Sequence, residues 1–331
     1  MPDVSTLLVL TLALVLAAEF VNGWTDAPNA IAAAVSTRVL SPGIAVTMAA
    51  VLNLVGAVVT GTAVATTIGT GIVKPEFIDL HVVAAAMLTI VLWSSLTALY
   101  GIPTSESHEL IAGLTGAGLA AAGPSVLLWA GWRKVIIGLG ISTILGFLLS
   151  VIIMTALYWI FRRTRLATIR STFSKLQILS TAFVAFSHGS NDGQKFMGAF
   201  ALALVLGGTM AEFAVPLWVM FLCGGVMAAG TASGGWRIIK TIGFKLTRRE
   251  PVNGFAAQSA GAIAILLAST FGIPLSTTHT VTSSIVGVGT TSRFSAVRWG
   301  MAGNIIIAWI LTFPVCAGLG YFFFWLLNMI F

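Results

Sequence analysis

Charged side chains are scarce in this sequence. Lys, Arg, Asp and Glu make up 8% of its 331 residues, whereas a soluble globular domain has about 25%. Apolar runs such as 7–18, 82–91 and 145–160 recur along the chain, and no polar stretch is long enough for a separate soluble domain. Apolar runs near 20 residues are typical of membrane-spanning helices. We therefore expect an all-α polytopic membrane protein that resides in the lipid bilayer.

Cysteine and N-terminal charge are also sparse. Cys223 and Cys316 both lie within apolar segments, which favours small buried side chains over a disulfide or a metal site. Asp3 is the only charged side chain before the first apolar run, so we expect no cleaved signal peptide. The net charge of +7 does not indicate nucleic acid, because the cations cluster at the ends of apolar segments, where they set topology.

Two motifs occur twice, about half the chain apart. Residues 20–26 (FVNGWTD) return as 186–192 (FSHGSND), and residues 101–108 (GIPTSESH) return as 272–279 (GIPLSTTH). Duplicated halves with interrupted hydrophobic segments at matching positions are typical of secondary transporters whose site lies between the repeats. Asn, Gly, Asp and Pro crowd together at 22–29, so a continuous helix is not expected there.

The duplication divides the chain into a first transmembrane repeat at 1–161, a basic link at 162–175 and a second transmembrane repeat at 176–331. The link and the loop 236–250 are rich in Lys and Arg, whereas the matching loop 67–81 has one Lys and two acids. Because positive loops stay in the cytoplasm, we expect the basic loops to be cytoplasmic, the repeats to be inverted and the chain to cross the cell (inner) membrane several times.

Two pairs of cations run against this orientation. Arg133 with Lys134, and Arg293 with Arg298, follow the second motif in each repeat, and inverted repeats cannot place both pairs in the cytoplasm. Inversion also needs an odd number of crossings per repeat. The number of crossings within 126–161 and 297–331 stays open, because each stretch fits one long helix or two short ones.

The second motif breaks each repeat at a hydroxyl-rich turn. The runs of small side chains that follow, 110–123 and 281–291, are too short to span a bilayer. We expect a re-entrant helical hairpin in each repeat, whose tip presents helix N-termini and hydroxyls to an anion. The alternative is a Pro-terminated helix with ordinary Ser or Thr caps. The candidate anion ligands are Thr104, Ser105, Glu106 and Ser107 in the first tip, Ser276, Thr277 and Thr278 in the second, and Lys195.

His108 and His279 occupy the same place in the two tips. We expect both to be hydrogen-bonded neighbours of the site rather than ion ligands. Lys195 aligns with Asn29, and its position alone leaves open whether it pairs with a carboxylate or contacts the anion.

The first motif places an Asp in apolar surroundings in each repeat. Ionisable side chains within membrane segments are costly and are functional candidates, and carboxylate and amide oxygens suit Na+. The alternative is that each Asp caps the next helix. Glu19 is also intramembrane but matches Ala185, so it stays unassigned. The candidate Na+ ligands are Asn22, Asp26, Asn29, Asn191, Asp192 and Gln194, with the ion held at Asp26 and Asp192.

The sequence closely resembles the PiT family of inorganic phosphate transporters over nearly its whole length. Gly-x-x-Asp at 23–26 and 189–192, and Gly-Ile-Pro with a later Ser and His at 101–108 and 272–279, match the family signature in order. The resemblance implies carriage of phosphate, usually with Na+ and in some bacterial members with H+, by alternating access. Some members of the family carry sulfate.

Three features depart from that family. Thr25 stands where Asn is usual, and Asn53 and Gln258 stand where animal relatives often have Glu. The large cytoplasmic insert of animal relatives is absent, since the link is short. The neutral amides could change the number or the kind of coupling ions.

These observations predict a secondary active transporter that imports inorganic phosphate by symport with Na+, with its site at the repeat interface near the membrane midplane. If Asp26, Asp192 and Glu106 surround an anion, their mutual repulsion of roughly several kcal/mol lets the anion bind well only with cations, which couples the two. A sulfate carrier and an H+-coupled phosphate symporter remain alternatives, and Glu106 as a hydrogen-bond acceptor favours phosphate over sulfate. An enzyme, namely a hydrolase using Asp, His and Ser, is not expected, because duplicated sites lack differentiated roles. No cofactor besides the coupling ion is expected, and a homodimer is left open.

Overall fold

The computed structural model describes residues 4–71, 77–245 and 250–331. Every regular element in these residues is a helix, which confirms the all-α class. The first half contains α1 (Val4–Thr25), α2 (Ala27–Ser36), α3 (Pro42–Val59), α4 (Ala63–Gly71), α5 (Leu80–Tyr100), α6 (Glu106–Ala122), η2 (Pro124–Val126) and α7 (Trp129–Phe161). The second half contains α8 (Leu166–His188), η3 (Gly189–Gly193), α9 (Gln194–Leu206), α10 (Leu217–Ser233), α11 (Trp236–Lys245), α12 (Pro251–Thr270), α13 (Thr277–Ser292), η4 (Phe294–Ala296) and α14 (Trp299–Ile330).

Length and hydropathy make this a membrane protein. Within the described ranges, six helices are long and apolar enough to cross a bilayer, and α10 with α11, bent by 71°, could form a seventh span. The six are Thr6–Ser36, Pro42–Val59, Leu80–Tyr100, Trp129–Phe161, Pro251–Thr270 and Trp299–Ile330.

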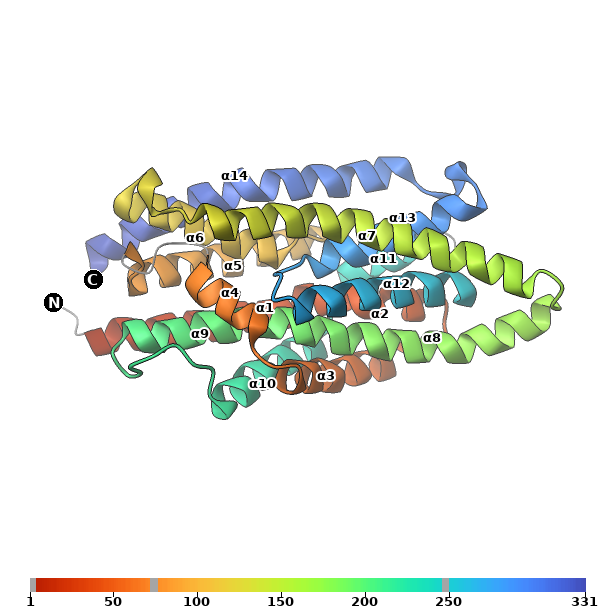
Figure 1. Ribbon diagram of the computed structural model, residues 1–331, viewed down its shortest axis with the longest axis horizontal. Helices are drawn as coiled ribbons and strands as arrows, with labels where there is room; N and C mark the ends of the chain where they lie inside the picture. The colour runs from red at the N-terminus through yellow and green to blue at the C-terminus, as the bar shows by residue number, and fades with distance from the viewer. Residues whose placement is uncertain (1–3, 72–76, 246–249) are drawn as a thin grey trace.

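The two halves have the same order of helices, and they exchange packing partners. Helix α1 packs against α10 while its counterpart α8 packs against α3, and α6 packs against α14 while α13 packs against α7. The matching helices α1 and α8, and likewise α7 and α14, run in opposite directions along the long axis (Figure 1). This is the arrangement that inverted repeats would have. The inversion across a membrane stays a prediction.

The acidic breaks are narrower than the sequence predicts. Only Asp26 separates α1 from α2, and its N–H donates to Asn22 O at 2.9 Å. Pro28 lies in the first turn of α2, where its missing N–H removes no helical hydrogen bond. In the second half the corresponding residues, 189–193, form the π-helix η3. π-Helical turns are rare overall, and those that occur are often found at functional sites. Both acidic breaks therefore keep a nearly helical backbone, and they lie at matching positions in the two halves.

The hydroxyl breaks are the tips of two hairpins. Helices α5 and α6 form one hairpin and α12 and α13 the other, and the two tips approach each other from opposite ends of the molecule (Figure 1). Gly101 and Gly272, with φ of 68° and 63°, provide the left-handed residue that ends α5 and follows α12. Helices α6 and α13 begin earlier than the expected 110 and 281, so Ser107, Thr277 and Thr278 lie in their first turns. Thr104, Ser105 and Ser276 lie just before these helices.

The tips touch at the centre. Ser107 Oγ donates to Leu275 O at 3.1 Å, and the rings of His108 and His279 lie 4.3 Å apart between centroids. The two halves therefore meet through the segments that the sequence analysis singled out.

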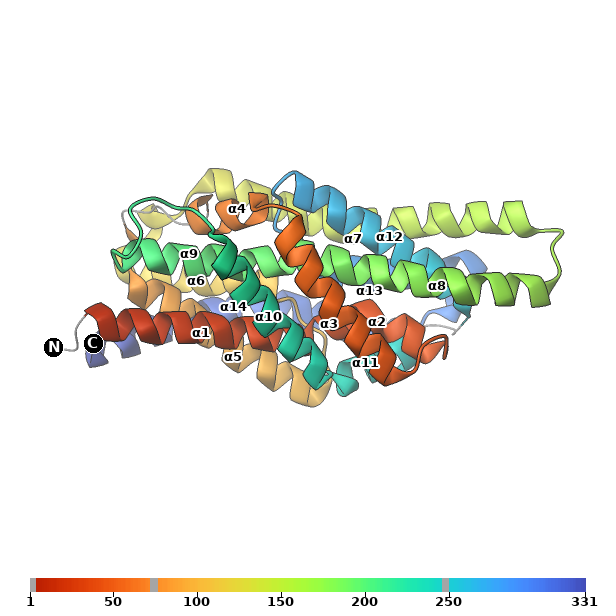
Figure 2. The same cartoon turned by 90° about the horizontal axis from the view of Figure 1, so that it is seen from below.

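The basic link is mostly helical rather than a loop. Helix α8 already begins at Leu166, and the hairpin of α7 and α8 extends beyond the neighbouring helices at one end (Figure 2). Some of the charged residues from which the membrane orientation was predicted, namely Lys74, Glu76, Arg248 and Arg249, lie outside the described residues. The placement of the basic loops in the cytoplasm and the repeat boundaries stay predictions.

Candidate functional site

One hydroxyl joins the two acidic breaks to the second hairpin tip. Thr277 Oγ1 lies 2.9 Å from Asp26 Oδ2 and 3.0 Å from Asp192 Oδ2. Both carboxylates are buried, with exposures of 2% and 0%. A hydroxyl has one proton and can donate it to only one oxygen at a time, so the two carboxylates share this donor.

Asp26 is surrounded by further donors. Thr278 Oγ1 and Asn29 Nδ2 both donate to its Oδ1, and Asn29 Nδ2 also lies 2.8 Å from Thr278 Oγ1. Asp26 makes no side-chain cap to α2. This contradicts the helix-cap alternative for Asp26 and leaves its carboxylate pointing to the hairpin tip.

Asp192 is paired with a buried lysine. Lys195 Nζ lies 2.5 Å from Asp192 Oδ1, 2.5 Å from Ser107 Oγ and 3.0 Å from Leu275 O. Lys195 is 1% exposed. Its position thus joins η3 to both hairpin tips. The pair with Asp192 is one of the two possibilities that the sequence left open, and contact between Lys195 and phosphate stays a prediction.

His188 lies between the two aspartates, and the sequence analysis missed it as a site residue. Its Nε2 is 3.5 Å from Asp192 Oδ2 and 4.0 Å from Asp26 Oδ2, and its Nδ1 is 3.2 Å from Asn53 Oδ1. Asp26, His188 and Asp192 each offer an atom within 4.8 Å of the others, which is a geometry that could hold a metal ion. The signal was present, because His188 occupies the place of Asn22 in the duplicated motif.

Glu106 faces the same centre from the first hairpin. Asn22 Nδ2 and Thr25 Oγ1 donate to its two oxygens, and Ser94 Oγ is 3.3 Å from Oε1. Ser94 also donates to Glu109, a second buried carboxylate on α6 that the sequence analysis did not select. Thr25, a departure from the usual family pattern, therefore has a defined role as a partner of Glu106.

Three amide oxygens near these carboxylates have no hydrogen-bond partner among the described residues. They are Oδ1 of Asn22, Asn29 and Asn191, all buried. Buried polar atoms are rarely left unpaired, and each exception needs an explanation. Amide oxygens are hard ligands that suit Na+. Asn29 Nδ2 donates to Asp26, and Asn22 Nδ2 lies 3.5 Å from Asp192 Oδ2, so the oxygens of these two amide side chains are candidate ligands for a cation at the centre.

Other predicted ligands lie apart from the cluster. Thr104 Oγ1 is 3.0 Å from Thr97 Oγ1, and its side chain also hydrogen-bonds Glu109, but it contacts neither aspartate. Gln194 is committed elsewhere, because its Oε1 accepts from Val64 N at 2.9 Å and its Nε2 donates to Ser190 O at 2.7 Å. Neither contact supports Thr104 as a phosphate ligand or Gln194 as a Na+ ligand.

Three further predicted ligands lie beside the cluster without a side-chain hydrogen bond to either aspartate of the centre. Ser276 caps α13, since its Oγ accepts from His279 N at 3.2 Å. Ser105 precedes α6, and its buried Oγ has no hydrogen-bond partner in the part of the chain that is described. Asn191 turns its amide nitrogen to Ser269 Oγ at 2.9 Å, which leaves its oxygen free.

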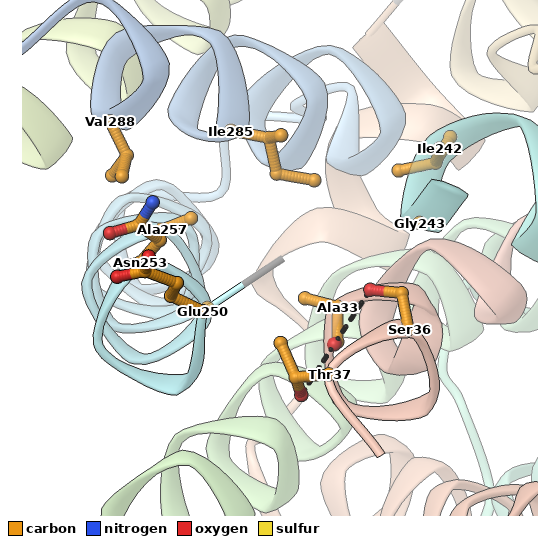
Figure 3. Close-up of a pocket in the computed structure, with 11 residues that line it drawn as sticks. Ala33, Ser36, Thr37, Ile242, Gly243, Glu250, Asn253, Ala257, Ile285 and Val288 are labelled. Carbon is orange, nitrogen blue, oxygen red and sulfur yellow. Dashed lines mark hydrogen bonds between the residues drawn. The ribbon is translucent and has the colours of Figure 1, made fainter. Parts of the chain in front are cut away.

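A small pocket lies about two helical turns from Asn29 along α2, between α2, α11, α12 and α13 (Figure 3). Its cavity volume is about 20 Å³, which is room for about one water molecule. Ser36, Thr37 and Asn253 line it, and Glu250 lies at its rim. The pocket therefore brings three polar side chains together at the end of the molecule where α12 begins, apart from the central cluster.

Comparisons with known proteins agree on one relationship. The model of PHO4, described as the phosphate transporter family, matches residues 22–320. The chain is 45% identical over 312 residues to a probable low-affinity inorganic phosphate transporter of Rhizobium meliloti, covering 94% of this chain and 93% of that protein. It is 42% identical to a protein of the same description from Bacillus subtilis, covering 98% and 99%.

A solved structure has the same fold. The protein described as the sodium-dependent phosphate transporter superposes with a TM-score of 0.89 at 24% sequence identity, covering 98% of this chain and 100% of that one.

Proposed function

This chain belongs to the phosphate transporter family, and from that premise we propose that it imports inorganic phosphate by symport with Na+. It is a transporter and not an enzyme. The proposed site is the centre where Asp26, Asp192 and the tip of α13 meet. The observation that carries the proposal is the set of donors that Thr277 and Thr278 direct to Asp26 and Asp192.

These donors explain how cation and anion can depend on each other. A Na+ held between Asp26 and Asp192 competes with the hydroxyls for the same carboxylate oxygens. Once displaced, the hydroxyls of Thr277 and Thr278 can turn to the oxygens of a phosphate at the N-terminus of α13, where free N–H groups and the helix dipole also favour an anion. Each ion thus creates the conditions for the other, which is positive coupling.

The charge balance points the same way. Asp26, Asp192 and Glu106 bring three carboxylates to the centre, and Lys195 is the fixed cation that meets them. Buried charges are strongly destabilising unless they are paired, and a phosphate would add further negative charge. The site therefore needs mobile cations before it can hold an anion.

Na+ is favoured over H+ as the coupling ion by the kind of ligands. Asp26, Asp192 and His188 Nε2 lie together, and the amide groups of Asn29 and Asn22 reach the two aspartates while their own oxygens have no partner among the described residues. Amide oxygens coordinate a metal cation, whereas a proton needs only a titratable group. An H+-coupled symporter would gain nothing from these amides.

Phosphate is favoured over sulfate by the same carboxylates. At neutral pH phosphate retains a hydrogen-bond donor, whereas sulfate has only acceptors, and a site of carboxylate acceptors discriminates against an anion that cannot donate. Asp26, Asp192 and Glu106 are such acceptors. Sulfate is the second candidate substrate and serves as the competitor in the test below.

We infer that the ions leave the centre on the side of the pocket shown in Figure 3, where Ser36, Thr37 and Asn253 provide polar side chains. Its lining residues Ser36 and Asn253 correspond to Leu202 and Val82 in the other half, where the matching region is packed with buried apolar side chains. We place this pocket on the cytoplasmic side of the cell membrane, the side assigned to the basic link.

The experiment is counterflow of radiolabelled phosphate in liposomes that contain the purified protein, with a Na+ gradient, a pH gradient or neither. We expect accumulation that follows the Na+ gradient and is little reduced by excess sulfate. Accumulation that follows only the pH gradient would promote the H+-coupled alternative, and strong inhibition by sulfate would promote the sulfate carrier.

A further inference from the structure

Glu19 is a further buried carboxylate on α1, and it lies on the N-terminal side of the central site. Glu19 precedes Asn22 by three residues and Asp26 by seven, so the three side chains lie along one face of the helix. Glu19 is 0% exposed, and neither Oε1 nor Oε2 has a hydrogen-bond partner among the described residues. This distinguishes it from Asp26 and Glu106, whose oxygens accept several donors.

The surroundings of Glu19 are apolar. Its neighbours on α1, Val15 and Ala18, belong to a buried hydrophobic cluster that also contains Met87 of α5 and Met197 of α9. Helix α1 packs against α5, α9 and α10. A bare carboxylate in such a place is costly unless it is neutralised.

Few titratable side chains lie on the neighbouring elements, and only two of them, a His and a Lys, can carry a positive charge. The titratable side chains are His81 and Tyr100 at the two ends of α5, Lys195 on α9, Cys223 on α10 and Asp192 on η3, while α2 has none. Asp192 and Lys195 act on Glu19 electrostatically, and they have opposite signs. Because those two are already paired with each other, neither serves as a dedicated counter-ion for Glu19.

A metal ion is a poor candidate for the same role. The group of side chains that could hold a metal ion in the described part of the chain is Asp26, His188 and Asp192, and Glu19 is not among them. One carboxylate alone offers too few oxygen ligands for Na+. A proton needs only the carboxylate itself.

We propose that Glu19 is a proton-binding site of the transport cycle, protonated when phosphate occupies the centre and deprotonated when Na+ alone occupies the carboxylate pair. The negative charge of a bound phosphate favours a proton on Glu19, and the positive charge of Na+ opposes it. By linkage the proton affects both ions in return. The proposal rests on the proposed function, since the bound phosphate is the partner of the proton.

The position of Glu19 fits such a role. Along the single span Thr6–Ser36, Glu19 lies on one side of Asp26 and the pocket at Ser36 lies on the other. The matching residue in the second half is Ala185, so the proton site belongs to one half only.

The test measures protons taken up when phosphate is added to purified protein in weakly buffered, Na+-saturated solution with a pH indicator. Wild type, E19Q, E19D and E212Q are compared, and E212Q is the matched control because Glu212 is exposed in a loop. We expect wild type, E19D and E212Q to take up protons, and E19Q to lose the part of that uptake that does not come from phosphate itself. Equal uptake by E19Q and wild type would overturn the proposal.

Phosphate binding is measured on the same samples. If wild type fails to bind phosphate, the proposed function fails and not the assignment of Glu19. If E19Q does not fold, infrared spectroscopy of wild type and E19D decides the question. The carbonyl band of a protonated carboxyl should grow on phosphate binding and should shift in E19D, and an unchanged band would contradict the proposal.

Discussion

Asn53 fixes the orientation of His188 at the centre of the molecule. Asn53 Nδ2 donates to Thr231 Oγ1 at 3.1 Å, so its Oδ1 is the acceptor that faces His188 Nδ1 at 3.2 Å. The proton of the neutral imidazole then resides on Nδ1. The lone pair on Nε2 points toward Asp26 and Asp192, where it can bind a cation.

Asn53→Ala should therefore weaken Na+ binding without touching the ion directly. It leaves a buried N–H of His188 unpaired and frees the ring to change tautomer, at about 1–3 kcal/mol. The Na+ concentration that gives half-maximal phosphate binding should rise by roughly tenfold or more, while Asn53→Asp should keep an acceptor and the low value. Asn304→Ala is the control, because Asn304 is exposed on α14. An unchanged Na+ requirement in Asn53→Ala would refute the positioning role.

Asp26→Asn and Asp192→Asn should each nearly abolish Na+-driven uptake, but they should differ in stability. Asp192→Asn leaves the buried Lys195 without its partner, and breaking a buried pair in this way destabilises by about 3–5 kcal/mol. Asp26→Asn leaves no such orphan. Thermal unfolding in detergent should show a lower midpoint for Asp192→Asn, restored in the double variant Asp192→Asn/Lys195→Met without restoring transport. Equal unfolding midpoints for the two single variants would show that the ion pair of Asp192 and Lys195 does not contribute this stability.

Thr277→Val and Thr278→Val should weaken phosphate binding. Each removes a hydroxyl that touches the aspartates and leaves a phosphate oxygen short of a donor, at about 1–3 kcal/mol. Thr277→Ser and Thr278→Ser should retain the affinity. Thr280→Val is the matched control, because Thr280 lies on the same helix and donates to Ser276 O instead. Phosphate affinity equal to that of Thr280→Val would exclude the second tip as the anion site.

Residues of the first hairpin tip should differ in their effect on phosphate uptake. Ser107 contacts Lys195 and Leu275, whereas Thr104 contacts Thr97. Ser107→Ala should reduce phosphate uptake several-fold more than Thr104→Val, measured as initial rates at matched protein levels. The reverse order would mean that the tip rearranges when phosphate binds.

The sequence predicted the parts of this site that are duplicated. Asp26 and Asp192 could be found because an acidic residue recurs in apolar surroundings, and Thr277 and Thr278 because the Gly-Ile-Pro motif recurs. A search for duplicated residues favours those that recur in both copies. His188 stands where the first copy has Asn22, so its residue type does not recur, and only the fold brings its ring between the two aspartates.

The spacing of residues in the sequence also could not predict the direction in which the side-chain amide of Gln194 points. Gln194 is two residues from Asp192, yet its side chain faces α4, where Val64 N donates to it. The near-helical path of the acidic breaks was not predictable either. Pro28 stops a helix only in its interior, and here it lies in the first turn of α2, where it is tolerated.

The central claim is that Na+ at Asp26 and Asp192 releases donors to phosphate. The most direct measurement is equilibrium binding of phosphate to the purified protein across a Na+ titration, at fixed pH and ionic strength, with choline as the replacement cation. We predict that phosphate affinity rises steeply with Na+, that phosphate raises Na+ affinity by the same factor, and that Asp26→Asn loses most of the dependence. Phosphate binding that is equally tight in choline and in Na+ would contradict the account.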